Sequence, residues 1–194
     1  MDTLLSIFLG IGLSAASGFR VFVPLLIMSI ASSSGNLTLS PEFAWLGTVP
    51  ALILFAVATL IEIAGYLIPW LDNLLDTIAT PAAVVAGVIV TASVITDMSP
   101  LLRWALAIIV GGGAAAVVQS ATVVTRAASS GTTGGCANPI VAIGEAVGSA
   151  LLSILAIAVP IVAGIVVFIV LGVFLFVGRK VAERIRRRLQ NRSA

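Results

Sequence analysis

The sequence contains no histidine, a single cysteine and few charged residues of either sign. The missing histidine excludes Ser/His/Asp and Cys/His catalytic units, together with every histidine-ligated metal site. The lone Cys136 forms neither an intrachain disulfide nor a thiolate cluster. Because no other catalytic motif is recognisable, we expect neither enzymatic activity nor a cofactor.

The scarcity of charge also excludes a soluble domain. Only 9% of the 194 residues are charged and 60% are hydrophobic, whereas about a quarter of a soluble protein is charged. The mean hydropathy is +1.22, and the chain has 18 glycines and 8 prolines, which are commoner in membrane helices than in soluble ones. We therefore predict an all-α, polytopic membrane protein with one membrane domain, residues 1–178.

The basic residues are concentrated at the C-terminal end. Seven of the ten follow residue 178, where Glu183 is the only acid, while the first 178 residues carry three arginines against seven acids. A basic run directly after an apolar segment typically stays in the cytoplasm, where each charge near anionic headgroups contributes about 1 kcal/mol. We predict that residues 179–194 form a cytoplasmic tail that contacts anionic lipid headgroups of the bilayer, with RNA or a protein partner as the alternative.

The length of the apolar region sets the number of crossings. A helix needs about 20 residues to cross about 30 Å of hydrocarbon, so residues 1–178 have room for six. Proline dipeptides that begin with a capping or apolar residue mark helix starts. These are Ser40-Pro41, Val49-Pro50, Thr80-Pro81, Ser99-Pro100 and Asn138-Pro139. The predicted spans are 4–31, 48–68, 78–96, 101–126, 139–157 and 159–178. Five or seven spans are alternatives, because only Pro160 divides residues 139–178.

The first predicted span is too long for one straight crossing. Residues 4–31 would form a helix of about 42 Å. Small residues from Ser14 to Gly18 favour a break there, and Pro24 removes a helical hydrogen bond just beyond. A broken helix is tolerated at membrane depth only where its freed backbone faces protein or a water-lined cavity. We predict a broken or re-entrant segment, with a proline kink in a tilted helix as the alternative.

A weak internal repeat links the two halves of the chain. The sequence at 85–90, VAGVIV, resembles VAGIVV at 162–167, and Glu62–Gly65 resembles Glu145–Gly148. Three spans in each half would make the halves inverted, as in many secondary transporters. Chance similarity between apolar segments is the alternative.

Arg20 and Glu62 are ionisable residues within long apolar runs. An arginine at mid-bilayer costs roughly 2.5–3.5 kcal/mol on insertion scales, so it should face a partner or water. Pairing Arg20 with Glu62 would compensate both charges. Such a pair serves either as a gate, proton site or ion-pathway element, or as a static bridge between helices.

Asp72 and Asp76 lie four residues apart, on one face of a segment with an apolar opposite face. The pattern predicts a short interfacial helix. Its carboxylates either bind a hard cation, although no calcium-loop pattern is present, or form an ordinary solvated face.

A glycine-rich polar stretch, residues 128–138, follows Arg126 and ends at Asn138. We favour a tight connection or re-entrant turn, with an anion-accepting turn as the alternative.

Beyond this stretch, Gly144 and Gly148 flank Glu145 in a GxxxG spacing, and residues 111–113 are a glycine triplet. Such faces pack helices within a protomer or between copies in a homo-oligomer. Glu145 is also the second-half counterpart of Glu62 in the suggested repeat.

Three stretches, Ser14–Leu26, Ile68–Gly87 and Thr132–Glu145, resemble a bacterial membrane family, DUF4126, over roughly residues 5 to 165. The family usually has leucine and glycine at the positions of Cys136 and Ala137, so the resemblance implies no special role for this thiol. It implies a bacterial inner-membrane protein of several helices. It implies no activity, and no functional residues are carried over from it.

Buried ionisable residues near helix breaks favour a small transporter or channel for an ion or small polar solute. The candidate polar-pathway residues are Arg20, Glu62, Asp72, Asp76, Arg126, Asn138 and Glu145. One alternative is a non-transporting assembly or scaffold protein whose charges lock helix packing. A membrane enzyme that uses carboxylates is a third.

The orientation in the membrane follows from the tail. With six spans and a cytoplasmic tail, the N-terminus and Arg126 are on the cytoplasmic side too, whereas an odd number of spans places the N-terminus on the opposite side.

Overall fold

The computed structural model describes residues 3–68 and 71–190, apart from the side chains of residues 72, 73, 175, 177, 178 and 181–190. Every regular element in these ranges is a helix, which confirms the predicted all-helical class. The elements are α1 (Thr3–Phe19), α2 (Phe22–Ser33), η1 (Pro41–Gly47), α3 (Val49–Tyr66), α4 (Leu71–Val94), α5 (Pro100–Leu106), η2 (Ala107–Gly112), α6 (Gly113–Thr133), α7 (Asn138–Ala158) and α8 (Pro160–Gln190).

Four helical segments are long and apolar enough to cross a membrane. They are α3, most of α4, the continuous run Pro100–Thr133 formed by α5, η2 and α6, and α7. Three shorter apolar helices are α1, α2 and the Pro160–Phe174 part of α8. The architecture is that of a helical membrane protein, whereas the predicted count of six crossings and the inverted repeat are not confirmed.

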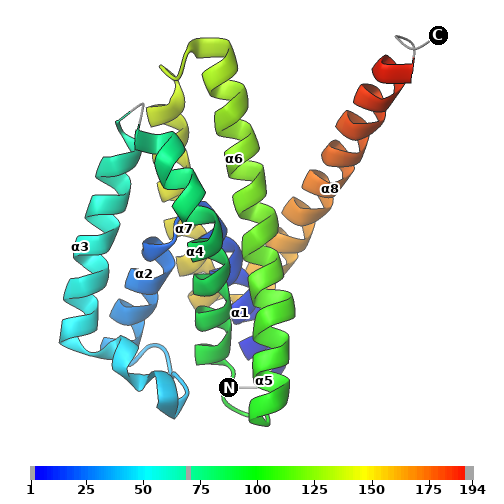
Figure 1. Ribbon diagram of the computed structural model, residues 1–194. Coiled ribbons are helices and arrows are strands. Elements are labelled where there is room, and N and C mark those ends of the chain that lie inside the picture. The colour runs from blue at the N-terminus through cyan, green and yellow to red at the C-terminus, as the bar shows by residue number, and fades with distance from the viewer. Residues whose placement is uncertain (1–2, 69–70, 191–194) are drawn as a thin grey trace.

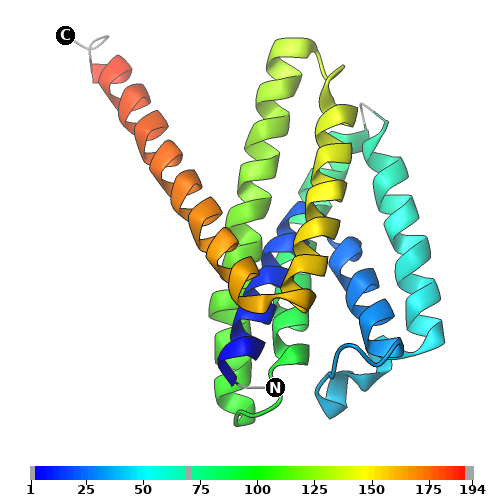
Figure 2. The same ribbon diagram turned by 180° about the vertical axis from the view of Figure 1, so that it is seen from behind.

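The long helices run alongside one another, with α1 among them (Figure 1). α1 packs against α4, α6, α7 and α8. Figure 2 shows α8 leaving the bundle at an angle from the end of α7. In both views α1 begins at the opposite end of the bundle from the one toward which α8 runs. This arrangement does not fit six spans with both ends of the chain on one side.

The proline dipeptides place most helix starts correctly. Pro41 begins η1, Pro100 begins α5, and Pro50 and Pro139 are the second residues of α3 and α7. The predicted start at Thr80-Pro81 is wrong, since Pro81 lies inside α4. There the hydroxyl of Thr80 donates to the carbonyl of Asp76 at 2.8 Å, which satisfies a backbone acceptor in the turn before the proline.

The first predicted span is divided into two helices, as expected, but not at the predicted residues. α1 continues through the small residues to Phe19, and α2 begins at Phe22. The break follows from Pro24, which has no N–H to donate to the carbonyl of Arg20 and whose ring clashes with a helical carbonyl there. α2 then turns back toward the end where α1 begins (Figure 1), so the two helices form a hairpin.

The small residues of α1 serve close packing instead. Ser14 is buried and its hydroxyl donates to the carbonyl of Gly111, within the wide π-helical turn η2. An added Cβ at Gly87 of α4 would lie 2.7 Å from Ser14 Oγ and 2.9 Å from the Gly111 carbonyl oxygen. Membrane helices associate through such close backbone approaches, so this three-helix contact fixes α1 against α4 and η2.

The GxxxG spacing does not have the predicted role within the protomer. A Cβ at either Gly144 or Gly148 would meet no atom within 4 Å, so neither glycine is needed for a close helix contact here. Within the glycine triplet, Gly111 and Gly112 are tightly packed, whereas Gly113 is open. Whether Gly144 and Gly148 pack between copies stays a prediction.

An ion pair anchors η1 to α5 at the end of the bundle where α1 begins. The two terminal nitrogens of Arg103 donate to the two carboxylate oxygens of Glu42 at 3.0 and 3.1 Å. The ring of Phe43 lies 6.1 Å from that of Trp104, and Trp45 is 51% exposed. Tryptophan is enriched at membrane–water interfaces, so this region has the composition of an interfacial belt.

The Glu42–Arg103 contact should resist acid. Hydrogen bonds from Arg103 lower the pKa of Glu42 from 4.5 to about 2. The stabilisation from a depressed carboxyl pKa is present above the unfolded value and is lost as the pH falls through the folded value. In a variant with Trp45 and Trp70 replaced by Phe, the Trp104 emission should therefore stay constant from about pH 7 to pH 4 and change only below about pH 3. A transition centred near the ordinary carboxyl pKa, or one that persists in Glu42→Gln, would contradict this assignment.

Candidate functional site

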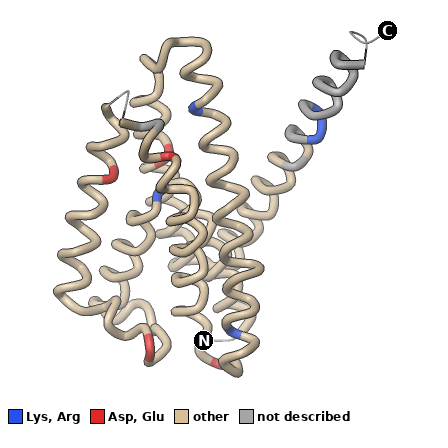
Figure 3. The backbone as a smooth tube through the Cα atoms, viewed as in Figure 1, with Lys and Arg blue, Asp and Glu red and all other residues tan. Residues whose placement is uncertain are grey.

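The buried charges gather around the tip of the hairpin formed by α1 and α2. Five ionisable side chains and one tyrosine approach one another there from α3, α4, α6, α7 and the break between α1 and α2; we refer to them as the charge cluster. Its members are Arg20, Glu62, Tyr66, Asp76, Arg126 and Glu145. Figure 3 shows how sparse charged residues are along the rest of the described helices.

Arg126 connects three helices at the centre of the charge cluster. Its Nε donates to Glu145 Oε1 at 3.2 Å and its Nη2 pairs with Glu145 Oε2, which makes the contact bidentate. Its Nη1 pairs with Asp76 Oδ1 at 3.0 Å. Arg126 is only 2% exposed. Arg126 lies eight residues before Gly134, the residue that caps the C-terminal end of α6, which is about 12 Å along the helix axis. The cluster therefore lies well inside the bundle.

Arg20 directly follows the last residue of α1, and its side chain reaches α7. Its Nη2 donates to the carbonyl of Ala142 at 3.0 Å and to Glu145 Oε2 at 3.1 Å, so it joins α1 to α7. A cation at a helix C-terminus is favoured by the helix dipole. Arg20 is 1% exposed, and its Nε and Nη1 have no hydrogen-bond acceptor among the residues that the structure describes.

Glu62 compensates the other side of the break. α2 has no capping side chain of its own, because Val21 occupies the N-cap position. The Glu62 carboxylate of α3 accepts hydrogen bonds from the backbone N–H groups of Val21 at 2.8 Å and Phe22 at 3.1 Å. These are helix N-terminal donors with no partner inside α2. A buried acid from another helix thus stabilises the broken backbone.

The predicted ion pair between Arg20 and Glu62 is therefore wrong. The two residues are near neighbours, but Arg20 pairs with Glu145, and no ion pair within 4.0 Å joins it to Glu62 among the described residues. The physical reason is that the Glu62 carboxylate is taken up by the backbone N–H groups at the start of α2, while the Arg20 side chain finds its acceptors on α7.

Tyr66 is the cluster member that the sequence analysis missed. Its hydroxyl donates to Asp76 Oδ1 at 3.1 Å, and the guanidinium carbons of Arg20 and Arg126 lie 3.8 and 3.9 Å from its ring centroid. An arginine over an aromatic face is stabilised by the ring quadrupole. The available signal was its position one turn after Glu62, as the only tyrosine in the sequence.

The two aspartates predicted to share one polar face have different outcomes. Asp76 is buried in the charge cluster, so the interpretation as an ordinary solvated face is wrong for it. It is buried because α4 already begins at Leu71 and its first turns pack beside α3 and α6. The side chain of Asp72 lies outside the described residues.

The glycine-rich stretch forms a tight connection, as favoured from the sequence. α6 extends to Thr133, and Gly134 and Gly135 have φ angles of +63° and +87°, a region that favours glycine. Asn138 begins α7, is 1% exposed, and donates through Nδ2 to Ser130 Oγ at 2.9 Å. It therefore ties α7 to the last turns of α6.

A partly polar cavity reaches the cluster between α4 and α6. Its volume is about 280 Å³, and it is lined by Asp76, Thr77, Thr80, Val123 and Ala127. Asp76 is thus the cluster residue at which this cavity meets the buried network. A carboxylate in that position has the chemistry to exchange a proton or a small cation with a hydrated space.

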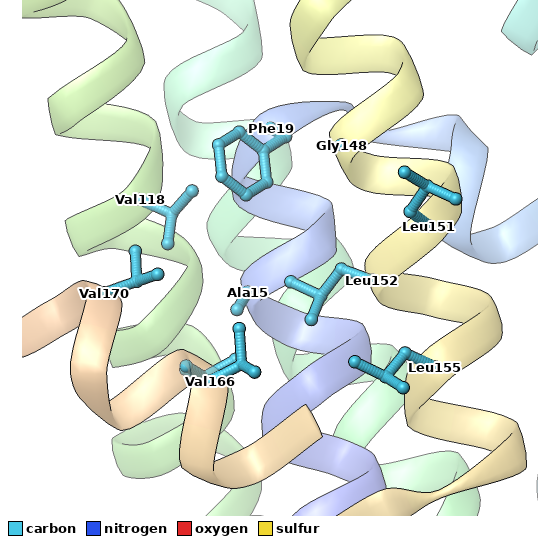
Figure 4. A pocket seen from close by; sticks show the side chains of 10 residues that line it. Ala15, Phe19, Val118, Gly148, Leu151, Leu152, Leu155, Val166 and Val170 are labelled. Carbon is cyan, nitrogen blue, oxygen red and sulfur yellow. The ribbon is translucent and has the colours of Figure 1, made fainter. Parts of the chain in front are cut away.

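A second cavity, of about 290 Å³, lies between α1, α6, α7 and α8 and is apolar (Figure 4). Phe19, Val118, Leu152 and Val166 point into it, and Gly148 forms part of its wall. It offers no acid or base, so it adds packing space beside α8 but no chemistry to the cluster.

Comparison with known proteins adds a family and no activity. The sequence profile described as "Domain of unknown function (DUF4126)" matches residues 7–180, which is most of the chain. No curated protein and no solved structure matches this chain.

Proposed function

This chain belongs to the DUF4126 family, which is defined without an activity, and we propose from the charge cluster that the protein is a small membrane transporter or channel for an ion or a small polar solute. The supporting observation is a set of buried charges from four helices at the tip of a re-entrant hairpin. Broken helices with charged residues at their ends form the ion and substrate sites of many secondary transporters.

The charge balance favours exchange of a positive species. The cluster contains three carboxylates, those of Glu62, Asp76 and Glu145, against two guanidinium groups. A net buried negative charge is costly, and a proton or small cation taken up from the Asp76 cavity would remove it. A static set of matched ion pairs would need no more carboxylates than guanidinium groups. The third carboxylate therefore favours exchange of a cation.

We further propose five crossings and a re-entrant hairpin in a bacterial inner membrane. In this topology α3, α4, the α5–η2–α6 run, α7 and α8 cross, and α1 and α2 enter and leave on one side. The observation that supports it is that α1 begins at the opposite end of the bundle from the one toward which α8 runs (Figure 1). With a cytoplasmic basic tail, the N-terminal end of α1 would lie on the other side of the membrane.

Flux in proteoliposomes tests the proposal. Purified protein should carry protons or another simple ion faster than empty vesicles do, measured with an enclosed pH-sensitive dye and with tracer Na⁺, K⁺ and Cl⁻. Glu145→Gln should reduce the flux by roughly tenfold or more, because it removes the carboxylate that two arginines share.

The matched control is Glu42→Gln, which removes an arginine-paired carboxylate outside the cluster. It should leave the flux unchanged. Folding of each variant is checked by gel filtration. Wild-type flux equal to that of empty vesicles for all tested ions, or equal loss in the two variants, would reject transport of these ions through the cluster.

A scaffold role is the second candidate, since every carboxylate of the cluster already has a hydrogen-bond donor within the protein. In that case the charges only fix helix packing, and homo-oligomers or other partners carry the function. Resistance of the folded protein to a membrane-permeant carbodiimide, which modifies accessible protonated carboxyl groups, would favour the scaffold. Modification of Asp76 or Glu145 would favour transport.

A further inference from the structure

We propose that the apolar cavity between α1, α6, α7 and α8 holds an acyl chain of an anionic phospholipid, whose phosphate lies against the basic C-terminal part of α8. This site is separate from the charge cluster, and the inference does not depend on transport. It concerns binding alone.

The cavity is lined only by apolar residues. Its volume is about 290 Å³, and its ten lining residues are alanines, valines, leucines, one glycine and one phenylalanine. A cavity of about 150 Å³ with walls of this kind stays dry and binds small hydrocarbons. A hydrocarbon chain is therefore the class of ligand that fits, because a polar ligand would find no hydrogen-bonding side chain on these walls.

The cavity opens toward the bilayer between α7 and α8. Leu151 of α7 and Val166 of α8 both line it (Figure 4), and their exposed fractions are 63% and 38%. Within the hydrocarbon core, acyl chains surround such exposed side chains. An acyl chain can therefore enter directly from the bilayer without crossing a polar region.

The space is too narrow for a helix of a second copy. α8 contacts α1, α6 and α7, and the axes of packed helices lie about 8–10 Å apart. A helix with its side chains is about 10–12 Å across. No further helix therefore fits among these four, whereas a flexible chain of methylene groups does.

The basic part of α8 begins at the depth of a lipid headgroup. The helix is continuous from Pro160 to Gln190, so Arg179 follows Val170 by nine residues, or about 14 Å along the axis. One leaflet contributes about 15 Å to the hydrocarbon core of a bilayer. A chain that ends in the cavity thus has its phosphate where the basic residues begin.

The register of α8 places positive charge on the face that lines the cavity. Eighteen residues make about five full turns of a helix, so backbone positions 184 and 188 share the face of Val166 and Val170. Both positions are arginine. A phosphate is attracted to such a basic cluster next to an apolar helix, so the charge on this face complements an anionic lipid.

Native mass spectrometry with a matched lipid pair tests the site. Delipidated protein in dodecyl maltoside is titrated with dioleoyl phosphatidylglycerol and with dioleoyl phosphatidylcholine, which carry the same chains and differ in net charge. We expect the first molecule of phosphatidylglycerol to bind about tenfold more tightly, since basic residues near the phosphate contribute to its affinity. Equal affinity for the two lipids would overturn the proposal.

Two glycines of α7 test the cavity. In Gly148→Leu the new side chain starts at the cavity wall, whereas Gly144 does not line the cavity, and a Cβ at either glycine meets no atom within 4 Å. Gly148→Leu should weaken binding of both lipids about tenfold, because it takes the space of the chain, and Gly144→Leu should leave binding unchanged. Equal effects would reject the site. A lipid-free wild-type dimer that only Gly148→Leu dissociates would also reject it, because a second copy would then cover the cavity.

Two double variants test the charged face. Arg184→Gln with Arg188→Gln removes two charges from the cavity face, and Arg179→Gln with Arg186→Gln removes two from positions about half a turn away. The first pair should abolish the preference for phosphatidylglycerol, and the second should retain most of it. Equal loss in both would show attraction to the whole tail and reject the assignment. Because α8 has left the bundle at these positions (Figure 2), this comparison decides the result even if Gly148→Leu fails to fold.

Discussion

Replacing Arg126 with methionine is expected to destabilise the folded protein by about 3 kcal/mol, the lower end of the range for removing one partner of a buried ion pair. Arg126 is the only cation bonded to Asp76 among the described ion pairs, and it makes a bidentate contact to Glu145. The lower end applies because Glu145 keeps Arg20 and Asp76 keeps the Tyr66 hydroxyl. The free energy of unfolding can be measured by SDS titration in bicelles.

Arg103→Met is the matched control for this substitution. Arg103 is also buried and bidentate with an acid, but the side chain of its partner Glu42 is 58% exposed to its surroundings. Water solvates Glu42 when Arg103 is lost, so the loss of stability should be clearly smaller. Adding Asp76→Asn to Arg126→Met should recover part of the lost stability, because Asp76 is the carboxylate that loses its arginine, while Glu145 stays paired with Arg20. Equal losses for the two arginines would show that Asp76 and Glu145 reach water.

A single added methyl group should have opposite effects at two glycines of the bundle. In Gly87→Ala the new Cβ would lie 2.7 Å from Ala115 Cβ and 2.9 Å from the Gly111 carbonyl oxygen, closer than real Cβ atoms come. The helices must move apart, at a cost of about 1–3 kcal/mol. The hydrogen bond from Ser14 to Gly111 would weaken at the same time.

In Gly148→Ala the new methyl group meets no atom within 4 Å. Alanine is favoured over glycine inside a helix by roughly 0.5–1 kcal/mol, so this variant should be neutral or more stable than the wild type. Unfolding in bicelles again measures both changes. If Gly87→Ala leaves the free energy of unfolding unchanged, α4 and η2 are packed less closely than the structure shows.

The class of fold was predictable from the sequence because composition alone decides it. With 60% hydrophobic residues and little charge, arranged in long apolar runs, the sequence favours membrane helices, which satisfy their backbone hydrogen bonds within each segment. The proline dipeptides located four helix starts through a local effect, namely that a missing N–H costs nothing in the first turn. Pro81 shows the limit of that rule, since packing of α4 tolerated a proline inside the helix.

The membership of the cluster was largely predictable, whereas its pairing was not. Burial cost identified Arg20, Glu62, Asp76, Arg126 and Glu145 as residues that need partners. Which acid meets which arginine depends on the rotation and depth of each helix, and these are set by contacts such as Ser14 with Gly111 that no local pattern encodes. The resemblance to DUF4126 was confirmed, but it supplied no residue roles.

The carboxylate cap supplied by α3 also constrains how the protein is made. When the ribosome has released only α1 and α2, the backbone donors of Val21 and Phe22 have no acceptor, and Arg20 still lacks Glu145, a residue 125 positions later in the chain. The hairpin therefore cannot complete its hydrogen bonds as an independent unit at that stage. Its final packing needs α3 and then α7, so the first segment to be synthesised is among the last to gain its final contacts.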